Sequence, residues 1–379
     1  MKQHVDHDKI AQEMQAFAQR VTRGLSALAA VGDVTIGGAP KDAVFALDKL
    51  TVYRYRPVAT VPDEDRVRVP VLICYALVNR PYMMDLQADR SLIRRLLDRG
   101  LDVYLIDWGY PDGADRYLEV SDYVLRYLPR CVEAVCAASG HDALNLLGVC
   151  QGGTLSLCFT ALEPQRVRNL ITMVTPVDFR TPDNLLTKWS EHVDLAQLVA
   201  ATGNVPGDML NALFLGLMPF RLTSQKYVDL MDHIEDPHAL ENFLRMEKWI
   251  FDSPDQPGEM FRQFMQWFLK ENRLAAGSLE LAGRGVDLGR ITMPVLNIYA
   301  SQDHLVPPSA SKPLAGLIGS RDYTEHEFRG GHIGIYVSGS AQREIPERIA
   351  TWLHAREPRR PSRKAFPRPL PRRRATVST

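Results

Sequence analysis

The chain opens with apolar residues spaced like one face of a helix. Between residues 8 and 29 they recur every three or four positions, at Ile10, Met14, Phe17, Val21, Leu25 and Leu28. This spacing predicts an amphipathic helix. Because its polar side is not notably basic, we expect the apolar face to dock on the body of the protein rather than on a membrane.

From residue 69 the pattern changes to short apolar runs that alternate with helical stretches. The runs predicted as strands are VPVLICYALV, LDVYLIDWG, ALNLLGV, NLITMVTPV, MPVLNIYAS and DYTEHEF. The predicted helices are SLIRRLLDRG, stopped by Gly100, SDYVLRYLPRCVEAVCAASG, with Ser121 as its N-cap, and GGTLSLCFTAL. This alternation predicts an α/β fold: a mainly parallel sheet with helices on both faces.

The strand-like runs stop between Pro176 and about Leu288, where aromatic residues, Met and Leu are abundant. We expect a helical cap inserted between two core strands. Its apolar residues either form a substrate entrance or a partner surface, or pack as a subdomain with its own core. The predicted division is residues 1–66 for the N-terminal helix and leading strands, 67–176 and 289–354 for the core, 177–288 for the cap, and 355–379 for a disordered tail.

Composition narrows the class of protein only a little. The 379 residues carry 45 basic and 45 acidic side chains, so net charge gives no sign of a nucleic-acid partner. The N-terminus is too charged for a signal peptide, and no apolar run approaches the roughly 18 residues that span a bilayer. Five cysteines without a C-x-x-C pair favour a reducing cytoplasm, and no metal-ligand or dinucleotide spacing is present.

The stretch GVCQGG carries the candidate chemistry. Gly148, Cys150 and Gly152 fit the G-x-S-x-G nucleophile elbow, with cysteine in place of serine, between a predicted strand and a predicted helix. In such an elbow the glycines permit a strained turn, and the N–H of the following residue, Gln151, can donate to an oxyanion. We therefore interpret Cys150 as a nucleophile and the other four cysteines as core residues.

An elbow of this type is followed in the chain by an acid and then a histidine. Asp303 follows a predicted strand in NIYASQDHLVPP, and His332 lies in the glycine-rich FRGGHIGIYVSG. His304 and His326 are weaker alternatives for the base, and Asp107 is expected to support a turn. A second oxyanion donor is expected from YALVNRPYMMDL, with Val78 or Asn79 as the candidate.

Cysteine at the elbow favours acyl transfer over simple hydrolysis. Its covalent intermediate is a thioester, which forms from an acyl-CoA at little cost in free energy and can still acylate an alcohol. Such a transfer requires that the cap exclude water.

Six motifs together resemble the catalytic subunit of class III polyhydroxyalkanoate synthases over residues 40–353. They are GVCQGG, YALVNRPYMMDL, IDWGYPD, MEKWIFDSPDQ, YASQDHLVPP and GGHIGIYVSG. The resemblance implies an α/β-hydrolase fold that polymerises short-chain (R)-3-hydroxyacyl-CoA, chiefly 3-hydroxybutyryl-CoA, and releases CoA as a product rather than a bound cofactor.

Carried over to this sequence, the resemblance implies that Cys150 holds the chain as a thioester and that His332 activates the thiol. By the family's usual assignment Asp303 helps activate the 3-hydroxyl, and orientation of His332 is its alternative role. The resemblance also implies a second, non-catalytic subunit, an oligomer, and a place on cytoplasmic polyester granules.

Three points stay open at this stage. A thioesterase or esterase of the same fold, and a non-catalytic granule scaffold, are alternative functions. The tail from Arg356 onward has nine basic residues, five prolines and one acid, and lies beyond the resemblance. It is either a solvated end or a contact for granule, partner subunit or nucleic acid.

Overall fold

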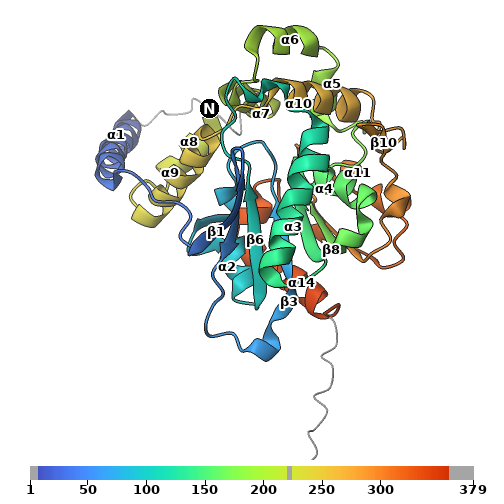
Figure 1. Ribbon diagram of the computed structural model, residues 1–379. Coiled ribbons are helices and arrows are strands. Elements are labelled where there is room, and N and C mark those ends of the chain that lie inside the picture. The colour runs from blue at the N-terminus through green and yellow to red at the C-terminus, as the bar shows by residue number, and fades with distance from the viewer. Residues whose placement is uncertain (1–6, 220–223, 358–379) are drawn as a thin grey trace, which may run out of the picture.

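The computed structural model describes residues 7–219 and 224–357. An eight-stranded sheet runs through the protein (Figure 1). In spatial order its strands are β1 (Lys41–Leu47), β2 (Leu50–Tyr55), β6 (Leu101–Asp107), β3 (Val67–Cys74), β7 (Leu144–Val149), β8 (Val167–Met173), β11 (Val295–Ala300) and β12 (Tyr323–Phe328). Strands β1, β2 and β6 pair antiparallel, and every pair from β6 to β12 is parallel. The predicted α/β class and mainly parallel sheet are confirmed.

Both faces of this sheet are covered by helices. Helices α2 (Leu92–Leu97) and α14 (Gly339–His354) pack on one face, and α3 (Leu128–Ser139) and α4 (Gln151–Leu162) on the other. All six residues of β7 are consequently buried, which is why its sequence is largely apolar rather than alternating. Its one polar side chain, Asn145, donates to the carbonyl of Val69 at 3.0 Å.

Two of the predicted helices begin in different ways. The Ser91 hydroxyl caps α2 by accepting the N–H of Arg94 at 3.0 Å. Ser121 was expected to cap the next helix, and that prediction is wrong: Ser121 has helical backbone angles and makes no cap hydrogen bond. Its hydroxyl donates to Glu119 instead, and a π-helical turn, η4 (Asp122–Tyr127), leads into α3.

Helices lie across the carboxyl ends of the strands, in the stretch between β8 and β11 (Figure 1). They are α5 (Leu185–Ser190), α6 (Leu195–Thr202), α7 (Gly207–Leu217), α8 (Lys226–Met231), α9 (Pro237–Phe251), α10 (Gly258–Phe264) and the π-helical η7 (Met265–Lys270). We call this group of helices the cap.

Short elements complete the described chain. They are β4 (Asp85–Gln87), β5 (Arg90–Ser91), β9 (Glu280–Leu281), β10 (Arg284–Gly285), α11 (Pro308–Ser311), α12 (Leu314–Leu317), α13 (Gly334–Val337), and the 3₁₀ turns η1 (Asp63–Asp65), η2 (Pro81–Met84), η3 (Asp115–Tyr117), η5 (Pro164–Arg166) and η8 (Leu288–Arg290).

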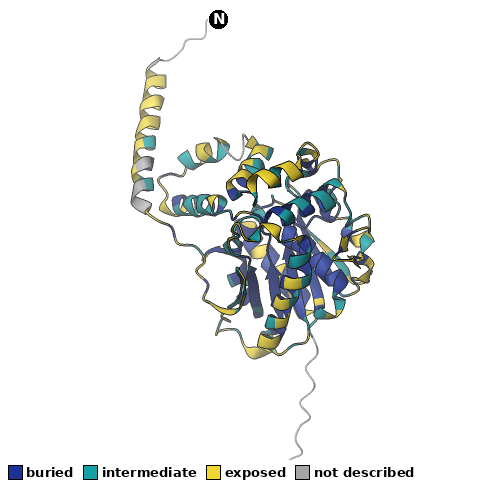
Figure 2. Cartoon of the chain, turned by 45° about the horizontal axis from the view of Figure 1, so that its top comes forward, coloured by how far each residue is buried: buried dark blue, intermediate teal, exposed yellow. Residues whose placement is uncertain are grey.

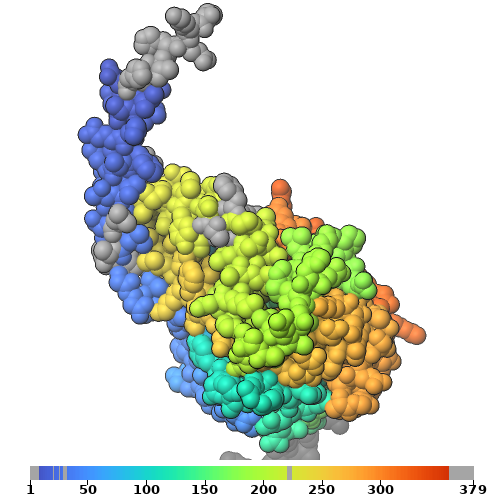
Figure 3. Space-filling view, turned by 90° about the horizontal axis from the view of Figure 1, so that it is seen from above, coloured from blue at the N-terminus to red at the C-terminus, as the bar shows by residue number. Residues whose placement is uncertain are grey.

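The predicted N-terminal helix is α1 (His7–Val31), but it docks only in part. Its second half lies beside α8 and α9. Gly24 packs closely there, because a Cβ on Gly24 would lie 2.2 Å from Cδ1 of Ile234. Its first half projects away from the body (Figures 2 and 3), and Ile10, Met14 and Phe17 are 45%, 68% and 57% exposed. The expectation that the whole apolar face packs on the body is therefore wrong.

Two further expectations concern the ends of the chain and membranes. The basic tail falls outside the described residues from 358 onward. Among the residues that the structure does describe, no helix has the length and apolar character needed to cross a bilayer.

Candidate active site

Cys150 lies at a sharp turn between β7 and α4. Its backbone is left-handed, with φ 53° and ψ −125°, a conformation that is strained for a residue with a Cβ. Strand pairing holds the turn, because the N–H of Cys150 donates to the carbonyl of Met173 on β8 at 3.0 Å. Cys150 is half-buried, whereas the other four cysteines are buried in the core.

Two glycines make this turn possible. A Cβ on Gly148 would lie 2.5 Å from the Cα of Gly153, and one on Gly152 would lie 2.3 Å from the carbonyl oxygen of Cys74. Both contacts are with backbone atoms, which cannot move aside as a flexible side chain can. The G-x-C-x-G spacing is thus required by close packing of the elbow against β3 and against the first turn of α4.

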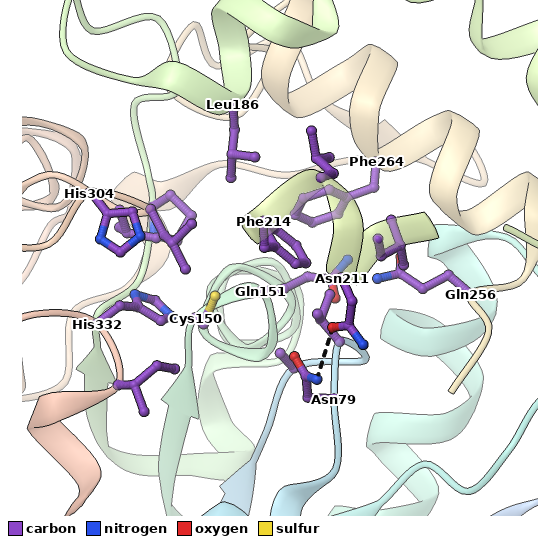
Figure 4. A pocket seen from close by; sticks show the side chains of 18 of the residues that line it. Asn79, Cys150, Gln151, Leu186, Asn211, Phe214, Gln256, Phe264, His304 and His332 are labelled. Carbon is purple, nitrogen blue, oxygen red and sulfur yellow. Dashed lines mark hydrogen bonds between the residues drawn. The ribbon is translucent and has the colours of Figure 1, made fainter. Parts of the chain in front are cut away.

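The three predicted residues Cys150, His332 and Asp303 lie together, although they come from three separate loops. His332 follows β12 and Asp303 follows β11, and the carboxyl ends of these parallel strands meet at the edge of the sheet where β7 delivers Cys150. The Nδ1 of His332 is 2.7 Å from Oδ2 of Asp303. The His332 ring lies beside the side chain of Cys150 at the cavity (Figure 4).

The carboxylate of Asp303 has both oxygens occupied. Oδ2 faces His332, and Oδ1 accepts the N–H groups of Leu305 and Val306, each at 2.9 Å. Its side chain is fully buried. Asp303 is thus fixed in one orientation, with His332 as its side-chain partner.

Burial alone would lower the pKa of His332, because a charged imidazolium is poorly solvated there. The negative charges of Asp303 and of the Cys150 thiolate outweigh that effect, and together with their hydrogen bonds they raise the pKa of His332 to about 10. The buried carboxylate of Asp303 thus favours the protonated form of the ring, which donates from Nδ1.

The loop after β3 approaches the elbow from the other side. The N–H of Leu77 donates to Oε1 of Gln151 at 3.1 Å, so this side chain ties the loop to the residue after the nucleophile. Because the N–H of Leu77 already donates to Gln151, it is not available to an oxyanion. The next N–H along the loop is that of Val78, one of the two residues expected from the sequence to supply the second oxyanion donor. At the start of α4 the N–H of Gln151 has no carbonyl within the helix to donate to.

A cavity of about 340 Å³ lies between these loops and the cap (Figure 4). Core residues on its wall include Val78, Cys150, Gln151, His304 and His332. The cap contributes a largely apolar wall that includes Leu186, Leu210, Phe214, Trp249 and Phe264. Cys150 therefore opens onto a largely apolar chamber.

The two histidines that were alternatives for the catalytic base, and Asp107, lie in different places. His304 lines the cavity and is half-buried, whereas His326 lies on β12 with its Nε2 2.8 Å from Glu344. Asp107 accepts from Arg80 at 2.8 Å and from the N–H of Gly109 at 3.0 Å. It thereby supports the turn after β6, as expected, and also anchors the loop that follows β3.

Sequence reasoning missed a polar cluster between the loop after β3 and the cap. Asn79 donates to Ser253 at 2.6 Å, and Ser253 donates to Asn211 at 3.0 Å. The three residues are up to 174 positions apart, so no local pattern joins them. The only available signal was that Asn79 and Ser253 both fall in motifs of the family resemblance.

No group of three or more His, Cys, Asp or Glu in residues 7–219 and 224–357 is arranged to hold a metal ion. The expectation that the protein uses no metal and no cofactor stays a prediction.

The strand order of the sheet and the nucleophile elbow at Cys150 are those of an α/β hydrolase, and so is the order of Cys150, Asp303 and His332 along the chain. In this protein cysteine takes the nucleophile position. Residues 69–338 match the family of the α/β-hydrolase fold, which confirms the fold class predicted from the sequence.

More specific relatives narrow this class. The chain is 55% identical over 349 residues to the poly(3-hydroxyalkanoate) polymerase subunit PhaC of Allochromatium vinosum, covering 92% of this chain and 98% of that protein. It is 52% identical to the subunit of Thiocystis violacea, with the same coverage of both chains. It is 50% identical to that of Synechocystis sp., covering 90% and 92%. The chain belongs to the family of poly(3-hydroxyalkanoate) polymerase subunits PhaC, and the resemblance seen in its motifs is confirmed.

Proposed function

We propose that this chain polymerises short-chain (R)-3-hydroxyacyl-CoA into polyester with release of CoA, through a thioester on Cys150. The observation that carries the proposal is a cysteine on a strained elbow, beside a buried histidine that is paired with Asp303, at the wall of an apolar cavity. Its membership of the PhaC polymerase family supports the same reaction class, an acyltransferase.

In the first half-reaction the Cys150 sulfur attacks the thioester carbonyl of the acyl-CoA. The carbonyl oxygen becomes an oxyanion, which the N–H groups of Gln151 and Val78 stabilise. The bond to the CoA sulfur then breaks, and the proton on His332 passes to the departing CoA thiolate. The acyl group is left on Cys150, and His332 is left neutral.

In the second half-reaction the hydroxyl oxygen of a 3-hydroxyacyl group attacks the Cys150 thioester. Neutral His332 takes the hydroxyl proton, an ester bond forms, and the bond to the Cys150 sulfur breaks. The thiolate and imidazolium are restored for the next cycle. Thioester and ester exchange of this kind requires no redox partner.

We assign to Asp303 the orientation of His332 rather than direct activation of the hydroxyl. Its two oxygens already accept from His332 and from two backbone N–H groups, and its side chain is fully buried. A substrate hydroxyl could reach it only by displacing one of these partners. Activation of the hydroxyl then falls to His332, which lies on the cavity wall.

The cavity favours transfer over hydrolysis, the main alternative. Its wall is largely apolar, so water is poorly held near the thioester, while a hydroxyacyl chain can bury its carbons there. A non-catalytic scaffold would have no use for a strained cysteine paired with a buried imidazolium. CoA is in this proposal a leaving group, and the substrates are the acyl-CoA and the growing polyester.

The proposal extends to partners and place in the cell. We expect a second, non-catalytic synthase subunit to raise activity, an oligomeric active form, and a location at the surface of cytoplasmic polyester granules. The support for these points is membership of the PhaC subunit family.

The test is to incubate the purified chain with (R)-3-hydroxybutyryl-CoA, with and without a class III partner subunit, following CoA release and turbidity together. We expect both signals, increased by the partner and absent from Cys150→Ala. CoA release in a clear solution that contains free 3-hydroxybutyrate would identify a thioesterase and overturn the proposal. A wild-type chain that releases no CoA with the partner present would support a scaffold.

A further inference from the structure

The cap holds the loop that follows β3 by the residue next to the expected oxyanion donor. Asn79 has a left-handed backbone, with φ 57°, which asparagine tolerates better than most residues. Its side-chain Nδ2 points to the cap, 2.6 Å from Oγ of Ser253 and 3.4 Å from the carbonyl of Ile250 at the end of α9. Val78, which precedes it, lies on the cavity wall.

Ser253 is itself fixed by the cap. Its hydroxyl donates to Oδ1 of Asn211 on α7 at 3.0 Å, and Nδ2 of Asn211 donates to the carbonyl of Ile250 at 2.5 Å. The cluster of Asn79, Asn211, Ser253 and the Ile250 carbonyl therefore joins one core loop to two cap helices. All of its side chains are partly or fully buried, so their polar atoms depend on one another.

The same end of α9 is fastened to the core on both sides of this cluster. The indole N–H of Trp249 donates to the carbonyl of Arg80 at 2.8 Å. The carboxylate of Asp252 accepts from Tyr82 at 2.9 Å and from Tyr110 at 2.6 Å. Three of the motifs that carry the family resemblance thus meet here: NRPY, GYPD and WIFDSPDQ.

Within the loop, Val78 stands between two fixed residues. Leu77 is held by Gln151 on the elbow side, and Asn79 is held by the cap. Anchors on both neighbours restrict the direction in which the N–H of Val78 points. Preorganised donors stabilise an oxyanion because they need no reorientation during the reaction.

We propose that Asn79 is a positioning residue: its hydrogen bonds to the cap segment Ile250–Ser253 hold the Val78 N–H as the second oxyanion donor, so that the oxyanion hole is complete only when the cap is docked. This inference rests on the proposed acyl transfer at Cys150. It gives the cap a part in the chemistry beyond lining the cavity.

The first variant is Asn79→Gly, which keeps the left-handed backbone accessible but removes the side-chain hydrogen bonds. We expect the rate of CoA release under saturating (R)-3-hydroxybutyryl-CoA to fall by about 10²-fold, comparable to removal of an oxyanion donor, with KM changed less than about threefold. Ser253→Ala, which leaves the Ile250 and Asn211 acceptors, should lose less, about 10-fold. The double variant should be no slower than Asn79→Gly alone, because both act through one contact.

A second readout separates this role from general damage to the site. Alkylation of Cys150 by iodoacetamide needs the thiolate and His332 but forms no oxyanion. Its rate and pH profile should therefore match wild type in both variants. Asn204→Ala is the matched control, because Asn204 is also a buried asparagine whose Nδ2 joins cap to core, but at the carbonyl of Asp112. We expect it to leave CoA release unchanged.

Three results would overturn the inference: full activity in Asn79→Gly, a rise in KM alone, or slower alkylation in parallel with turnover. Burst acylation of Cys150 by p-nitrophenyl acetate is measured on the same variants, since it needs the oxyanion hole but no polymerisation. If wild type makes no polyester, the proposed function fails, whereas the burst still decides whether Asn79 acts on acyl attack.

Discussion

The two sides of the cavity differ in how their side chains are held. We call the loops at the carboxyl ends of the strands the floor, and the cap helices the roof. On the floor, Cys150, Asp303 and His332 stand on loops at the ends of buried parallel strands, and each is held by hydrogen bonds. On the roof, the cap helices contribute mainly apolar side chains, some of which pack ring against ring. The rings of Phe264 and Phe268 are stacked, with their centroids 4.6 Å apart. The contrast teaches that the sheet fixes the reacting atoms, whereas the cap controls what surrounds them. Variants on the floor should therefore reduce the chemical step, and variants of the apolar side chains on the roof should reduce binding.

The largest effect that this comparison predicts is on the floor, at Asp303. Asp303→Asn removes the acceptor that fixes the Nδ1 proton of His332, so we expect kcat for CoA release to fall about 10³- to 10⁴-fold with little change in KM. Steady-state assays with (R)-3-hydroxybutyryl-CoA measure it, with exposed Glu64→Gln as the control. A loss below 10-fold would mean that the orientation of His332 has another source.

The next largest effect is expected for a variant of the elbow, which tests whether backbone packing holds the elbow in place. Gly152→Ala places a Cβ 2.3 Å from the carbonyl oxygen of Cys74, so the elbow must move away from β3. We expect the free energy of unfolding to fall by about 2–4 kcal/mol, as overpacking against backbone does.

Urea unfolding measures this difference. Gly113→Ala serves as its control, because no atom lies within 4 Å of the added Cβ there. Equal stability of the two variants would show that the elbow can relax, against the contrast drawn between floor and roof.

A smaller effect is expected on the roof. Phe214→Ala removes part of the apolar wall, and loss of about 1–2 kcal/mol of burial corresponds to a roughly 10-fold rise in KM. We expect kcat to change less than about threefold. The same kinetic assay on Val228→Ala provides the control, since Val228 on α8 is 60% exposed. If Phe214→Ala lowers kcat instead, the roof takes part in the chemical step at this position too.

The smallest effect concerns the charge shared by Cys150 and His332. The Cys150 thiolate contributes to the raised pKa of His332, which is about 10, and a serine at that position stays neutral over this range. Removing a negative neighbour disfavours the imidazolium, so in Cys150→Ser the pKa of His332 should be lower than in wild type. NMR titration of the His332 ring measures its pKa in wild type and in Cys150→Ser. An unchanged titration would mean that Asp303 alone sets the charge of the ring.

Much of the floor was predictable because local patterns encode it. A buried parallel strand must be largely apolar, the elbow requires glycines at fixed spacing, and loops after successive parallel strands must meet at one edge of the sheet. Gly148, Cys150, Asp303 and His332 could therefore be brought together before any coordinates, although their roles in catalysis stay proposals. The prediction for Ser121 failed because the helix begins before it: Ser121 already has helical backbone angles, and Asp122 accepts the N–H of Glu119 in front of that start.

The sequence by itself determined the class of fold, the order of the chemical groups along the chain, and the family to which the chain belongs. Tertiary structure alone decided that Asp303 has no oxygen to spare, that half of α1 stands away from the body, and that Asn79 is held by Ser253 of the cap. The physical reason is distance along the chain. Strand and elbow patterns repeat over a few residues, whereas hydrogen bonds between a core loop and the cap join residues 174 positions apart and exist only once both have folded.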